Sequence, residues 1–183
     1  MNLTKKIVSL AAATALVAGA GAMAAAPAQA KGKTSGTTLI SLKADVAPLF
    51  ASVVAVAPAK KDGPRITFPV TGVVGNGVEH SGALKVGALE VSDPIILIGE
   101  NNTASVTVNV ASLQTRVELF TLKNFKPGKP SKKGKTTTTV WKGFVHLTSN
   151  PVVVGALNQA AGAEVFTADM GLGGIRTTLR VTK

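Results

Sequence analysis

Two histidines and a run of lysines are the side chains of this sequence best suited to binding a ligand. His80 lies in the stretch GVEHSGALKV, where apolar and polar residues alternate as in a β-strand, and the alternation places it on the apolar face. Ser81 and Gly82 follow it, and such small residues leave room for a ligand or for a neighbouring backbone. On these residues alone, His80 is either a ligand for a bound group or a core-edge histidine that donates to a backbone carbonyl.

The remaining chemistry-bearing residues predict neither a metal site nor an enzyme. His146 lies in another alternating stretch, where we expect an exposed strand histidine. Two histidines need further ligands to hold a metal, and no His, Cys, Asp or Glu cluster has metal-binding spacing. The acidic residues are thinly spread, and neither a nucleophile elbow nor a Walker loop is present. We therefore expect a non-enzymatic protein.

The segment KNFKPGKPSKKGK contains six lysines and no acid: Lys123, Lys126, Lys129, Lys132, Lys133 and Lys135. Its Pro and Gly residues disfavour a regular helix or strand, so we expect a basic loop that projects into solvent. Such a loop either is simply solvated or binds a polyanion, with an affinity that falls steeply as salt rises. Specific nucleic-acid binding is not expected, because aromatic residues that could stack on bases are few and tyrosine is absent.

The N-terminus has the three parts of a secretory signal peptide. A basic start, MNLTKK, precedes the apolar stretch IVSLAAATALVAGAGAMAAA and a small-residue site that ends at Ala30. We expect cleavage after Ala30, with a retained membrane anchor as the alternative, and a single domain over residues 31–183. No second long apolar run follows, so we expect no transmembrane segment after cleavage. The product would be secreted, and any association with the cell envelope would depend on contacts alone.

Composition narrows the class of exported protein further. The chain has no cysteine, which excludes disulfides and a lipid attached through a cysteine. The net charge of the whole chain is +11, and because residues 1–30 contain Lys5, Lys6 and no acid, the mature chain carries +9. An unanchored cationic protein of this kind suits contact with anionic envelope polymers.

The elements that must position these residues are mostly strands. Apolar residues recur with a period of two in RITFPV, ASVTVNV, TRVELFTL, TTTTVWKGFVHLT and GIRTTLRVT. Two short helices interrupt them. One is expected in KADVAPLFASVVAVA, from the stripe Val46, Leu49, Phe50, Val53 and Val54, and one between the cap Asn150 and Gly162. The fold class is therefore mainly β (α+β): an antiparallel β-sandwich or a partly open barrel with two short helices.

Three segments stand in an order and spacing that resemble a known family. They are RITFPVTGVVGNGVEHSGALKV, TRVELFTLK and WKGFVHLTSNPVVVGALNQAAGAEVFTADMGLGGIRTTLRV, and together they run from residue 65 almost to the end. This arrangement resembles secreted actinobacterial proteins related to the HtaA-type haem-uptake domain. The resemblance implies a β-rich domain with two short helices that is exported by a Gram-positive actinobacterium and that, in the best-understood members of the family, binds haem at the cell surface.

The resemblance also implies a site. In haem-binding members, a tyrosine near the start of the domain ligates the iron, and the histidine of a later turn, matched here by His80, assists. This chain contains no tyrosine, so the iron would need His80 itself, or a lysine or methionine, as its ligand. Ser81 and Gly82 would then belong to the pocket, while Ala83 stands where the family has a second glycine.

Two functions follow from these patterns. The first is a secreted, non-enzymatic HtaA-like module whose haem binding is weakened by the missing tyrosine, with haem or a haem-carrying surface protein as its partner. The second is an envelope-associated structural or adhesive module that binds anionic cell-wall polymers through the six lysines.

Overall fold

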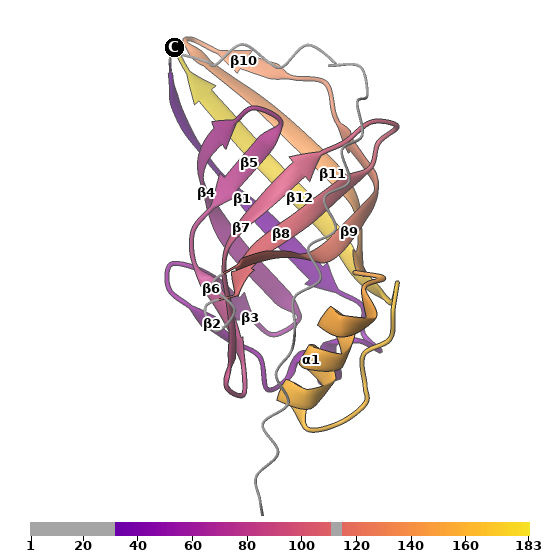
Figure 1. The fold of residues 1–183 in the computed structure, drawn as a ribbon. Helices are drawn as coiled ribbons and strands as arrows, with labels where there is room; N and C mark the ends of the chain where they lie inside the picture. The colour runs from indigo at the N-terminus through magenta and orange to yellow at the C-terminus, as the bar shows by residue number, and fades with distance from the viewer. Residues whose placement is uncertain (1–31, 111–114) are drawn as a thin grey trace, which may run out of the picture.

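The strands of this protein form one antiparallel sheet that closes into a barrel (Figure 1). The computed structural model describes residues 32–110 and 115–183, so the predicted signal peptide lies outside the described residues. The elements are β1 (Lys33–Leu42), η1 (Ala47–Phe50), β2 (Val54–Val56), β3 (Lys60–Asp62), β4 (Arg65–Val74), β5 (Gly77–His80), β6 (Ala83–Val86), β7 (Leu89–Ile98), β8 (Ala104–Val110), β9 (Thr115–Pro127), β10 (Ser131–Lys133), β11 (Thr136–Leu147), α1 (Pro151–Ala161) and β12 (Gly171–Thr182).

The barrel wall consists of eight strands in the order β7, β5, β4, β1, β12, β11, β9 and β8. The ring closes because β7 pairs with β5 on one side and with β8 on the other. The remaining strands extend this wall: β6 and β2 continue from β7, β3 pairs with β4, and β10 pairs with β11. Of the two architectures predicted from the sequence, the barrel is confirmed and the sandwich is wrong, and the barrel is closed rather than partly open.

The period-two alternation of the sequence determines which side chains of each strand point into the barrel. Ile66, Phe68 and Val70 of β4 are buried, and so are the alternate valines of β8. Together with inward side chains from the other strands, they form one hydrophobic cluster within the described part of the chain. A strand whose alternate residues enter such a cluster leaves its other residues at the surface, as the sequence predicted.

Of the two predicted helices, only the second is an α-helix. The Asn150 side chain accepts a hydrogen bond from the backbone N–H of Val152 at 3.0 Å and caps α1, which ends at Gly162 with a left-handed φ of 70°. The first predicted helix is wrong in extent, because η1 is a single 3₁₀ turn. Val54, which the helical stripe placed inside, belongs to β2 and is 60% exposed, since pairing with β6 draws this segment into the sheet.

The predicted basic loop is also wrong, because most of its lysines lie on strands. Lys123 and Lys126 belong to β9, whereas Lys132 and Lys133 belong to β10, which forms a hairpin with β11. The Pro and Gly residues that argued against a strand fall mainly in the turns between these strands, such as Gly134 with a φ of 58°. The lysine-rich segment is therefore an ordered extension of the barrel wall.

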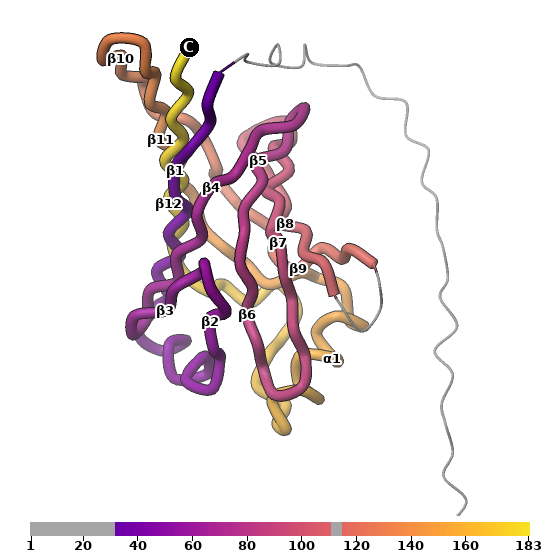
Figure 2. The backbone as a smooth tube through the Cα atoms, turned by 90° about the vertical axis from the view of Figure 1, so that its left-hand side faces the viewer, coloured from indigo at the N-terminus to yellow at the C-terminus, as the bar shows by residue number. Residues whose placement is uncertain are grey.

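The two ends of the barrel differ in what they carry. Figures 1 and 2 place β10 and the C-terminus at one end, and α1 with the β2 and β3 strands toward the other. Among the described residues, no helix combines the length and apolar character that crossing a membrane requires.

Candidate functional site

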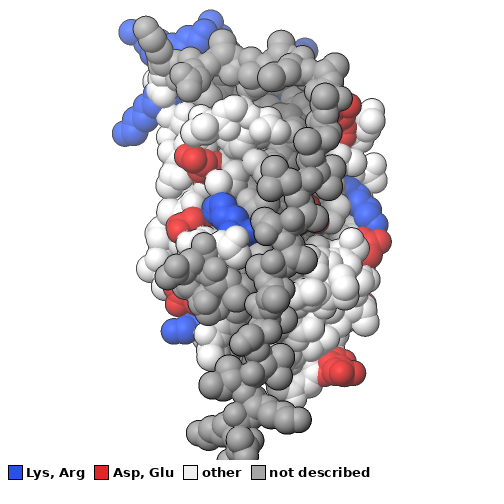
Figure 3. All heavy atoms as spheres, viewed as in Figure 1, with Lys and Arg blue, Asp and Glu red and all other residues white. Residues whose placement is uncertain are grey.

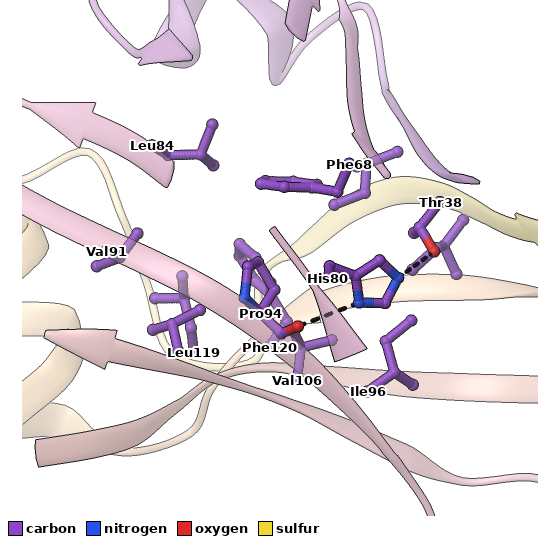
Figure 4. A pocket seen from close by; sticks show the side chains of 13 residues that line it. Thr38, Phe68, His80, Leu84, Val91, Pro94, Ile96, Val106, Leu119 and Phe120 are labelled. Atoms are coloured by element: carbon purple, nitrogen blue, oxygen red, sulfur yellow. Dashed lines mark hydrogen bonds between the residues drawn. The ribbon is translucent and has the colours of Figure 1, made fainter. Parts of the chain in front are cut away.

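His80 is the last residue of β5, and its side chain points into the barrel (Figure 4). Only 4% of the residue is exposed. Its Nε2 lies 2.7 Å from the hydroxyl of Thr38 on β1, and its Nδ1 lies 3.1 Å from the carbonyl oxygen of Pro94 on β7. The Thr38 hydroxyl lies in turn 2.8 Å from that of Thr177 on β12. A hydrogen-bonded chain thus crosses the barrel interior.

The direction of each hydrogen bond follows from the Pro94 carbonyl, which can only accept. His80 must therefore donate through Nδ1, which leaves Nε2 of the neutral ring as an acceptor for the Thr38 hydroxyl. Thr38 has then used its proton, so Thr177 donates to Thr38. Burial lowers the pKa of His80 from 6.5 to about 4, because removing the imidazolium from water disfavours the charged form. The ring is neutral at pH 7.

The space beside His80 is a small apolar cavity. Apart from Thr38 and His80 its lining is apolar, including Phe68, Leu84 and Ile96, and its volume is about 20 Å³. That is room for about one water molecule. Over the ranges 32–110 and 115–183, every buried side-chain nitrogen and oxygen already has a hydrogen-bond partner. Haem, a flat macrocycle many times larger than water, does not fit here, and neither ring nitrogen of His80 is left to bind iron.

Ser81 and Gly82 lie at a break between two strands. The sequence predicted one strand over residues 78–86, but β5 ends at His80 and β6 begins at Ala83. Gly82 has a φ of 104°, and a Cβ there would lie 2.5 Å from the backbone nitrogen of Ala59. The small residue therefore accommodates a neighbouring backbone rather than a ligand. The structure matches the reading of His80 as a histidine that donates to a backbone carbonyl.

His146 and Lys123 meet at Asp169 on the surface. Nδ1 of His146 donates to the backbone oxygen of Asp169 at 3.1 Å, and Lys123 Nζ lies 2.8 Å from Oδ2 of the same residue. The hydrogen bond from Lys123 lowers the pKa of the Asp169 carboxyl below its usual value. In the part of the chain that the structure describes, no group of three or more His, Cys, Asp or Glu side chains could hold a metal ion. Lys123 is thus paired with an acid and stands apart from the other predicted polyanion-binding lysines.

The other lysines of the segment gather around β10. Lys129, Lys132, Lys133 and Lys135 are exposed. The outer ends of β1 and β12 bring further cations to them: Lys183 donates its backbone N–H to the Lys135 carbonyl at 3.1 Å, and Lys33 and Arg180 belong to adjoining ends of β1 and β12. We call these seven residues the cationic end: Lys33, Lys129, Lys132, Lys133, Lys135, Arg180 and Lys183.

The sequence pattern missed three members of the cationic end, because they lie far from the lysine segment along the chain. In the sequence, Lys33, Arg180 and Lys183 could have been connected with that segment only through their positions at the outer limits of the predicted domain. In Figure 3, Lys and Arg atoms gather at the corner of the molecule where Figure 1 places β10 and the C-terminus. Lys126 lies further down β9, beside a groove in the barrel wall.

Comparison with known proteins shows a similarity of fold. No family model and no curated protein matches the sequence. Among solved structures, the chain is similar to the crystal structure of the C-terminal domain of HtaA from Corynebacterium glutamicum, with a TM-score of 0.52 and 15% sequence identity. The match covers 82% of this chain and 98% of that domain. The fold is therefore HtaA-like over nearly the whole of that domain, as the sequence resemblance predicted.

Proposed function

We propose that this chain, which has an HtaA-like fold, is a secreted and non-enzymatic module that binds anionic polymers of the cell envelope through its cationic end. The export part of the proposal rests on the sequence of residues 1–30, and the non-enzymatic part on the lack of catalytic motifs in the sequence. Haem is a weaker candidate ligand: the likeness to HtaA favours it, while the small volume of the cavity beside His80 argues against it.

The observation that carries the proposal is the separation of charge within the molecule. The sequence has no acidic residue between Glu118 and Glu164 and none after Asp169. β10, β11, β12 and most of β9 therefore contain cations without acids, and the hairpin and the outer ends of β1 and β12 bring the seven residues of the cationic end together. Across the described ranges, no residue of the cationic end forms an ion pair. Exposed positive charge of this density attracts polymers that carry repeated negative charge.

The alternative for the same residues is that they only keep the protein soluble. Scattered lysines would serve solubility equally well, and natural surfaces usually mix both signs of charge. Here the hairpin holds the lysines of β10 on an ordered strand at the tip of the barrel, so less side-chain and backbone freedom is lost when a ligand binds. This ordered placement favours a binding role.

The test compares retention on isolated Gram-positive cell walls for the chain from Lys31 and for its Lys129→Gln/Lys132→Gln/Lys133→Gln variant. Each exposed lysine contributes up to ~1 kcal/mol at an anionic surface, so we expect the triple variant to bind roughly tenfold to a hundredfold more weakly. Binding of the unchanged chain should fall steeply as salt rises. The measurement is a co-sedimentation isotherm at several salt concentrations.

A matched control removes three lysines from elsewhere. Lys43→Gln/Lys60→Gln/Lys61→Gln changes the net charge equally, but these residues follow β1 or lie in β3 and are not part of the cationic end. This control should retain most of the binding. Equal losses in the two triple variants, or retention that does not respond to salt, would contradict the proposal.

A further inference from the structure

The outer wall of the barrel carries an open groove over β1, β12, β11 and β9. The groove has a volume of about 1080 Å³ and is far larger than the cavity beside His80. Lys126, Lys142 and Arg176 line it together with the exposed side of Phe144. Its lining also includes Pro127 and Gly128, where the chain leaves β9 toward β10, so the groove leads toward the cationic end.

The three cations of the groove stand in a row across neighbouring strands. Lys142 on β11 is the direct register partner of Lys126 on β9 and of Arg176 on β12. Side chains at directly opposed positions on one face of a sheet have Cβ atoms about 5 Å apart, and like charges placed there destabilise the sheet. None of the three forms an ion pair in the described ranges, although acids are available elsewhere in the chain. An anionic ligand would remove this repulsion.

An apolar surface lies beside the row. Phe144 is 55% exposed and is two residues along β11 from Lys142. Its register partner on β12 is Gly174, where an added Cβ would meet no atom within 4 Å. The missing side chain at Gly174 therefore leaves open space opposite Phe144, next to the three cations.

We propose that this groove binds one stretch of a linear polymer that carries a phosphate or carboxylate in each repeat unit. Successive anions would lie against Lys126, Lys142 and Arg176, and the less polar part of a repeat would pack on Phe144. A polymer suits the site better than a small anion, because a row of three cations needs several negative charges and the groove is open toward the cationic end. This inference rests on the proposed function and adds the place where the polymer is held.

The test places a negative charge on the floor of the groove. Gly174→Glu introduces a carboxylate into space that is open in the structure, at a position that does not need a left-handed backbone. Gly155→Glu in α1 is the matched control, because a Cβ there also meets no atom within 4 Å and the change in net charge is the same. Affinity for synthetic poly(glycerol phosphate) and for polygalacturonate is measured by isothermal titration calorimetry. We expect Gly174→Glu to weaken binding of at least one polymer about tenfold or more, and Gly155→Glu to change it less than about twofold.

A second variant separates binding from folding. Lys142 stands between two like charges, so Lys142→Gln should leave the urea midpoint unchanged or raise it, while it weakens polymer binding about fivefold to tenfold. If Lys142 had only a structural role, the midpoint would fall and the affinity would not.

The outcomes distinguish the inference from the proposed function. If both glycine variants bind like the unchanged chain while the Lys129→Gln/Lys132→Gln/Lys133→Gln variant loses binding, the groove is not the site and the proposed function stands. If the unchanged chain binds neither polymer, both are overturned. If single-stranded DNA of matched charge binds more tightly and Gly174→Glu also weakens that complex, the groove takes a nucleic acid and the assignment to an envelope-type polymer is wrong.

Discussion

At the scale of single residues, His80 shows how a histidine can lie inside a fold with both ring nitrogens hydrogen-bonded to other strands. The sequence predicted the face on which it lies. Val78, His80 and Leu84 are all buried, as the alternation predicted, although the chain breaks between β5 and β6. Its partners Thr38, Pro94 and Thr177 were not predictable, because they come from β1, β7 and β12, and only barrel closure brings these strands around it.

The neutral state of His80 predicts a specific dependence of stability on pH. Its pKa is about 4 in the folded chain and 6.5 in the unfolded chain, so between these values the unfolded chain binds the extra proton. The stabilisation is complete above pH 6.5 and is lost as the pH falls toward 4, by roughly 3 kcal/mol. We expect the free energy of unfolding in urea to decrease over this range.

A variant that cannot titrate isolates this contribution from that of the carboxylates. His80→Gln can still accept from Thr38 but has no pKa in this range, so its unfolding free energy should vary less between pH 6.5 and 4. An identical slope for the two proteins would mean that His80 is not the group that titrates.

At the scale of elements, the sequence predicted strands well and their lateral partners poorly. The second helix was predictable because Asn150 and Gly162 end it locally. The end of the first helix was not predictable, because the residues that follow η1 form β2 by pairing with β6, and the local sequence pattern does not indicate that pairing. The β10 hairpin was not predictable for a similar reason: most of the Pro and Gly residues of the segment lie between its strands, whereas Lys132 and Lys133 pair with β11.

Asn158 joins the helix to the segment that leads into β12. Its side-chain oxygen accepts from the backbone nitrogens of Val165 at 3.0 Å and Phe166 at 2.8 Å, and its amide donates to the Phe166 carbonyl at 2.9 Å. Phe166 in turn packs edge-on against Phe50 of η1, with ring centroids 5.6 Å apart. One side chain therefore fixes the contact between two elements that are distant in the sequence.

We expect Asn158→Ala to lower the free energy of unfolding by about 2–3 kcal/mol, because each lost hydrogen bond costs about 1 kcal/mol. Asn150→Ala removes a single capping bond and should cost about 1 kcal/mol. Urea unfolding followed by tryptophan fluorescence at Trp141 measures both. Equal effects of the two substitutions would show that the bonds to Val165 and Phe166 contribute little.

At the scale of the whole molecule, closure of the barrel decides which of the predicted sites can meet a ligand. The sequence supported a barrel or a sandwich equally, because closure depends on the pairing of β7 with both β5 and β8, and alternation within a strand does not specify its neighbours. Once the ring is closed, His80 lies inside it and the predicted lysines lie outside.

Closure predicts the result of a haemin titration. A ligand of that size cannot reach His80 unless paired strands separate, so titration of haemin into the chain from Lys31 should give no saturable Soret shift that depends on His80. The control is the same titration of His80→Ala, with haemin in buffer as reference. A shift that saturates at one equivalent and disappears in His80→Ala would establish His80 as an iron ligand and would require the barrel to open.

The gathering of cations at one end also gives the molecule an orientation. A body whose positive charge is concentrated at one tip is turned by the field of a negatively charged surface before contact, so that this tip arrives first. The long axis of the barrel would then stand upright on the surface, with β10 and the chain terminus against it. The opposite end, with α1, would face outward, and this is the part of the molecule that a second protein would meet.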